Sequence, residues 1–99
     1  MAYDPGALNA SLAAAVGSDS ALMGELRVAF VESAERTVDL MGRARCDAHW
    51  QLAASRLKSL AASFGAVGLL DLASEALDGA PGDPVVLRRI RAAIDDFAR

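Results

Sequence analysis

The stretch at residues 55–66, SRLKSLAASFGA, carries the clearest helical pattern of the chain. Leu57, Leu60 and Phe64 recur at intervals of three and four residues, which predicts a helix that turns these side chains toward a core. The residues between them are small or charged, so the opposite side of the helix is expected to be exposed, small and flat. Gly65 predicts the turn that ends the helix.

Helical patterns also lie on both sides of this stretch. Asp4-Pro5 and Asp83-Pro84 each combine a capping side chain with a proline in the first turn, and Asp47 is a candidate cap for the helix that contains residues 55–64. Gly79 predicts the end of another helix. The chain therefore predicts five helical segments, at about residues 5–16, 20–45, 47–64, 67–78 and 84–97.

Short connections between these segments favour helices that pack against their neighbours in the sequence. We expect an all-α fold, an antiparallel up-and-down four-helix bundle with a short extra N-terminal helix, in a single domain of residues 1–99. Trp50 is expected to anchor the core. Apolar spacing predicts the buried stripe of segment 20–45 at Leu22, Leu26, Phe30, Ala34, Val38 and Met41, and that of segment 67–78 at Val67, Leu70, Ser74 and Leu77.

Composition excludes several classes of protein. The net charge of −3 argues against a nucleic-acid partner, and no apolar run approaches the roughly 20 residues that a membrane span needs. Cys46 is the only cysteine and His49 the only histidine, so we expect no internal disulfide, no metal site and no cofactor. No basic and apolar signal segment opens the chain, and a cytoplasmic location is expected.

The helix at residues 47–64 resembles the active helix of histidine-phosphotransfer (HPt) domains, whose pattern Ala-His-x-Leu-Lys-Gly is followed by a Gly-Ala pair. The residues that match this pattern at its spacing are Ala54, Leu57, Lys58, Gly65 and Ala66. Ser55 stands where the family has its phosphorylated histidine, and Ser59 replaces the glycine after the lysine. The resemblance extends over residues 5–98 and implies a module of two-component phosphorelay signalling.

In such domains an exposed imidazole on the flank of the bundle receives a phosphoryl group from the aspartate of a receiver domain, and positioning supplies most of the catalysis. A neutral imidazole is a nucleophile near pH 7, whereas a serine hydroxyl is weak without an adjacent base. A phosphoserine ester would also be too stable to pass its group to an aspartate. Ser55 is therefore expected not to accept phosphate, and the chain is not expected to be an enzyme.

The resemblance then implies a binding module that docks a response-regulator receiver domain or a histidine kinase. Its contact surface is predicted on one side of the helix, with the positive charges setting the orientation of the partner. The predicted contact residues are Gln51, Ser55, Arg56, Lys58, Ser59, Ala62 and Ser63.

Two alternatives remain open. His49 could replace the missing histidine and make the chain a competent phosphotransfer carrier, although it lies six residues before Ser55, about 120° around the helix and about 9 Å along it, and no lysine follows it three residues later. Alternatively, the chain could be a helical self-association domain unrelated to signalling. The sequence leaves the oligomeric state open.

Overall fold

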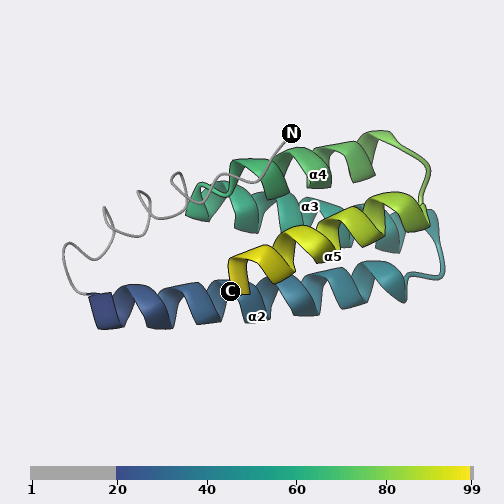
Figure 1. The fold of residues 1–99 in the computed structure, drawn as a ribbon. Helices are drawn as coiled ribbons and strands as arrows, with labels where there is room; N and C mark the ends of the chain where they lie inside the picture. Colours follow the sequence, from purple (N-terminus) through teal and green to yellow (C-terminus); the bar gives the residue numbers. More distant parts are fainter. Residues whose placement is uncertain (1–19, 99) are drawn as a thin grey trace.

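The structure, a computed structural model, describes residues 20–98, and the helix expected at residues 5–16 lies outside that range. All regular structure between residues 20 and 98 is helical, with four helices and no strand, which confirms the all-α class (Figure 1). The helices are α2 (Ser20–Gly42), α3 (Asp47–Phe64), α4 (Val67–Asp78) and α5 (Pro84–Ala98).

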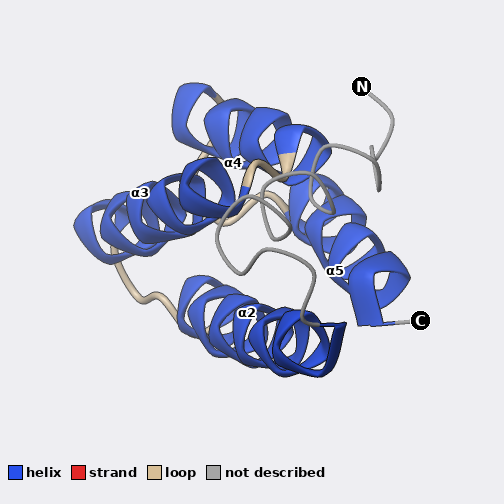
Figure 2. Cartoon of the chain, turned by 90° about the vertical axis from the view of Figure 1, so that its left-hand side faces the viewer, coloured by secondary structure: helices blue, strands red, loops and turns tan. Residues whose placement is uncertain are grey.

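The four helices pack around one shared interior. Each helix contacts the next in the sequence, and α5 returns to contact α2, as the view along the helices in Figure 2 shows. As a result α3 is flanked by α2 on one side and α4 on the other. One side of α3 is thereby committed to the core and the opposite side faces outward.

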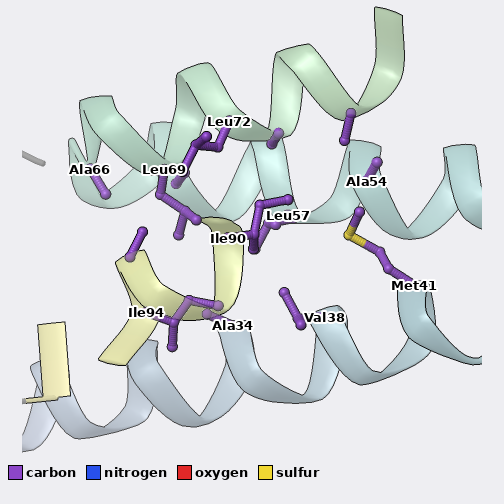
Figure 3. Packing of buried hydrophobic residues seen from close by; sticks show 14 of the residues in the cluster. Ala34, Val38, Met41, Ala54, Leu57, Ala66, Leu69, Leu72, Ile90 and Ile94 are labelled. Carbon is purple, nitrogen blue, oxygen red and sulfur yellow. The ribbon is translucent and has the colours of Figure 1, made fainter. Parts of the chain in front are cut away.

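The interior is formed almost entirely by aliphatic and aromatic side chains, and no polar or charged residue between 20 and 98 is fully buried. Side chains from all four helices meet there (Figure 3). The ring of Phe30 lies 4.9 Å from that of Phe64 and 5.3 Å, edge-on, from that of Phe97. These rings join α2, α3 and α5. The largest fully buried side chains are Trp50, Phe30, Phe97, Met41, Leu57, Leu69, Ile90, Ile94 and Val38.

Helix α2 follows its predicted stripe over most of its length. Phe30, Ala34, Val38 and Met41 are buried, but Leu22 is 40% exposed in the first turn, where α2 extends past the other helices (Figure 1). The sequence predicted that this helix would continue to about residue 45, but it ends at Gly42. Glycine is a poor helix former, which favours an end at this position.

Of the three predicted aspartate caps, Asp4 lies outside the described residues, and the other two have different outcomes. Asp83 caps α5 as expected, since its Oδ1 accepts a hydrogen bond of 2.9 Å from the backbone N–H of Val85. The prediction for Asp47 is wrong, because Cys46 occupies the capping position of α3 and makes no side-chain capping bond. Asp47 is instead the first residue of the helix, where its negative charge lies at the positive end of the helix dipole.

The predicted stripe of α4 is also wrong. The buried face contains Gly68, Leu69, Leu72, Ala73 and Ala76, whereas Val67 is exposed and the other predicted positions lie at the margin of the core. Apolar residues occupy most of the circumference of this short helix, so their spacing alone permits more than one stripe. The observed choice places small side chains at the core, which lets neighbouring helices approach closely.

A hydrogen bond ties the start of α3 to the end of α4. Trp50 is 2% exposed, and its indole Nε1–H donates to the backbone oxygen of Ala76 over 3.1 Å. Ala76 belongs to the last turn of α4, where carbonyl groups lack an amide partner from their own helix. The predicted core anchor therefore also satisfies a buried helix terminus.

None of the helices described between residues 20 and 98 combines the length and the apolar character that a membrane span requires.

We predict that Trp50→Phe lowers the free energy of unfolding by about 2–3 kcal/mol, because it removes packed area and leaves the Ala76 carbonyl without its donor. Urea denaturation followed by far-UV circular dichroism would measure the change, since the substitution removes the only tryptophan of the chain. Val85→Ala, at an exposed position of α5, is the control and should cost less than about 0.5 kcal/mol. Equal stability of the two variants would contradict this role of Trp50.

A pair of glycines provides a second prediction. Gly65 has a φ of 69° in the turn after α3, so Gly65→Ala should lower the free energy of unfolding by about 1–2 kcal/mol. Gly24 lies within α2, and no atom of residues 20–98 outside its own helix turn lies within 4 Å of where its Cβ would be, so Gly24→Ala should raise the free energy of unfolding by about 0.5–1 kcal/mol. Thermal and urea unfolding would test both signs, and a destabilising Gly24→Ala would contradict an unobstructed helical position at Gly24.

Candidate functional site

Helix α3 presents the predicted contact residues on its outer side. Its core side is fixed by five buried residues that pack toward the other helices, and the opposite side is exposed. Every predicted contact residue is exposed: Gln51, Ser55, Arg56, Lys58, Ser59, Ala62 and Ser63. We refer to these seven residues as the α3 face.

The α3 face carries positive charge that no ion pair within residues 20–98 neutralises. The two ion pairs within residues 20–98 join Arg89 to Glu75 and Arg91 to Asp39, so neither Arg56 nor Lys58 takes part in one. A partner that carries carboxylates could therefore approach both side chains without displacing an internal ion pair.

The serine hydroxyl groups of the α3 face differ in their hydrogen bonding. Ser63 Oγ donates to the backbone oxygen of Ser59, one turn earlier, over 2.9 Å. Within residues 20–98, Ser55 has no carboxylate or imidazole hydrogen-bonded to its side chain that could act as a base. An unassisted serine hydroxyl is a weak nucleophile.

His49 lies on a different part of the surface. It is exposed in the first turn of α3, directly before Trp50 in the sequence, and it lines a groove of about 640 Å³ between the end of α2 and the first half of α3. The lining residues of this α2–α3 groove are Leu40, Arg43, Ala44, Arg45, His49, Leu52, Ala53 and Arg56. Arg56 belongs both to this groove and to the α3 face, so the two surfaces adjoin.

Sequence reasoning missed several of these residues. Leu52 is 52% exposed beside the α3 face, which is therefore less flat than expected. A helical wheel places Leu52 only about 60° from Ser55, and this was the available signal. Leu40, Arg43 and Arg45 were missed because segment 20–45 was expected to stay helical to its end, whereas the chain leaves the helix at residue 42 and turns toward α3.

No cluster of three or more His, Cys, Asp or Glu side chains that could hold a metal ion occurs between residues 20 and 98. Cys46 is a free thiol at the exposed start of α3. The α3 face and the adjoining groove present guanidinium, ammonium, imidazole and hydroxyl groups beside exposed leucines.

Comparison with known proteins adds no relative. The chain matches no protein-family model, no curated protein and no solved structure.

Proposed function

We propose that this chain is an HPt-like module of two-component signalling that docks a receiver domain or a histidine kinase through the α3 face without accepting phosphate at Ser55. The observation that carries the proposal is the exposure of all seven predicted contact residues on one side of α3. Their positions relative to Gly65 follow the spacing of the HPt pattern. Ser55 lies centrally on this surface, where the family has its reactive histidine.

The scaffold in this proposal is an antiparallel up-and-down four-helix bundle. Two features support it. The connections are short, at residues 43–46, 65–66 and 79–83, and helices adjacent in the sequence are also adjacent in space (Figure 1). Short connections force consecutive helices to reverse direction, because a parallel return would need a longer crossover.

Docking without transfer follows from the chemistry of Ser55. The small side chains of Ser55, Ser59 and Ala62 allow a partner's surface to approach the helix, while Lys58 and Arg56 complement an acidic pocket. A receiver domain held in this way would not lose its phosphoryl group to the serine. The module would then compete with a phosphotransfer partner or hold a receiver in one state.

One observation favours a second candidate, in which His49 carries the phosphoryl group. His49 is exposed and shares its groove with three arginines, whose charge would stabilise a bound phosphoryl group. In this reaction an imidazole nitrogen attacks the phosphorus of an aspartyl phosphate, the aspartate oxygen leaves as a carboxylate, and the displaced imidazole proton passes to water. The candidate requires the partner to dock over the groove and not over Ser55.

We predict that at least one receiver domain or histidine kinase from the same genome binds the folded chain, and that Lys58→Glu weakens this binding about tenfold or more. Isothermal titration calorimetry against a panel of these domains would measure the effect. Arg88→Glu, an equal charge reversal at an exposed position of α5, is the matched control and should leave the affinity unchanged. A folded protein that binds none of the panel, or that self-associates through the α3 face in light scattering, would refute the docking proposal.

We also predict that Ser55→His accepts phosphate from a phosphorylated receiver that binds the wild type, because the substitution restores a nucleophile at the docked position. Labelled phosphate in an acid-labile, alkali-stable linkage would report the transfer. The wild type should remain unlabelled. Label on the wild type that disappears in His49→Gln would establish the second candidate in place of the first.

A further inference from the structure

The α2–α3 groove concentrates positive charge in a chain that is negative overall. Arg43, Arg45 and Arg56 line it, and among residues 20–98 no carboxylate lines it, although the net charge of the chain is −3. Neither ion pair within residues 20–98 involves these arginines. Arg43 Nε donates to the backbone oxygen of Asp39 over 3.4 Å, which orients the side chain without neutralising it.

The same groove exposes two large apolar side chains. Leu40 of α2 is 44% exposed and Leu52 of α3 is 52% exposed, and both line the groove. An isolated exposed leucine is ordinary, but two from different helices that share one hollow form an apolar floor, here surrounded by guanidinium groups. A hydrated phosphate or other small inorganic anion would gain nothing from this floor. A ligand that combines carboxylates with apolar side chains would use both features.

The shape of the groove indicates the kind of ligand. On α3 the lining residues His49, Leu52, Ala53 and Arg56 are spaced i, i+3, i+4 and i+7, so this wall follows about two turns, or about 10 Å, of helix. Grooves between two helices typically take an amphipathic helical segment whose anchoring side chains recur at three or four residues. About two turns of such a segment would fill this length.

The surroundings of the groove disfavour larger anionic partners. Asp47 begins α3 and is exposed, whereas Asp39, one turn before Arg43, is paired with Arg91 of α5. The duplex of a nucleic acid or an anionic membrane would extend beyond the groove and meet the Asp47 carboxylate and a chain of net negative charge. A short peptide segment can place its carboxylates on the arginines alone.

We infer that the α2–α3 groove is a docking site for a short acidic amphipathic segment of a partner protein. Carboxylates of the segment pair with Arg43, Arg45 and Arg56, and its apolar side chains pack on Leu40 and Leu52. This site does not depend on phosphorelay signalling, and only Arg56 is common to it and the α3 face, so a receiver bound there would share this one guanidinium with the segment.

Selection from a displayed library of random peptides of about twelve residues, with the full chain as bait, would test the inference. We expect enrichment of sequences that combine several Asp or Glu residues with apolar residues three or four positions apart. The best peptide, synthesised with a fluorophore, should bind the Arg43→Glu/Arg45→Glu variant and the Leu52→Asp variant about tenfold or more weakly than the wild type. Its affinity should also fall as salt rises from about 50 to about 300 mM.

The matched controls are Arg88→Glu and Val85→Asp, which place the same changes at exposed positions of α5 and should leave peptide affinity unchanged. Circular dichroism would confirm that each variant is folded. No enrichment, enriched peptides without acidic residues, or equal loss of affinity in the controls would overturn the inference. Groove-dependent binding of a DNA duplex or of phosphatidylglycerol vesicles, with peptides failing, would overturn it as well.

Lys58→Glu separates this inference from the proposed function. Lys58 lies on the α3 face but outside the groove, so this variant should keep its affinity for the selected peptide. If receivers fail to bind the wild type while the peptide binds in a groove-dependent manner, only the receiver proposal fails. If a receiver binds and is released by Lys58→Glu while no groove-dependent peptide is found, only the groove inference fails.

Discussion

The burial of one side of α3 is the constraint on which the other features of this chain depend. Trp50, Ala53, Ala54, Leu57 and Ala61 all face the interior, and the three alanines allow α2 and α4 to approach the helix closely. The indole of Trp50 also donates to a carbonyl in the final turn of α4. These contacts leave α3 no freedom to rotate about its axis, because a rotation would expose the tryptophan and bury charged side chains. The orientation of the outer side follows from the packing of the inner side.

Much of the helical architecture between residues 20 and 98 could be predicted, and the successes have local causes. Asp83-Pro84 and Gly65 act on the backbone through a capping hydrogen bond and a positive φ, so they mark helix ends regardless of tertiary context. The predictions failed where the sequence was compatible with two local arrangements. Helix α4 is apolar on most of its circumference, and only its neighbours decide which face is buried. Asp47 is a good capping residue by type, but Cys46 takes the capping position because the backbone turns one residue earlier.

The two candidate surfaces also differ in how far the sequence predicts them. The α3 face could be placed from spacing along a single helix, since a periodic helix fixes which residues share a side. The α2–α3 groove could not, because its arginines come from the connection after α2 and its walls come from two helices. Bringing Leu40 beside Leu52 depends on where α2 ends and how residues 43–46 cross to α3. No period in the sequence encodes that crossing.

The exposed side chains of these surfaces contribute little to folding. Exposed leucines bury little area, and the three arginines of the groove have no ion-pair partner within residues 20–98 and repel one another. Replacing Leu40 or Arg45 by small polar residues would therefore not be expected to weaken the core, whereas replacing Leu57 would. Arg56 stands at the junction of both surfaces, so one guanidinium could serve a ligand on the α3 face or a ligand in the groove, and simultaneous occupancy would require the two ligands to share its positive charge.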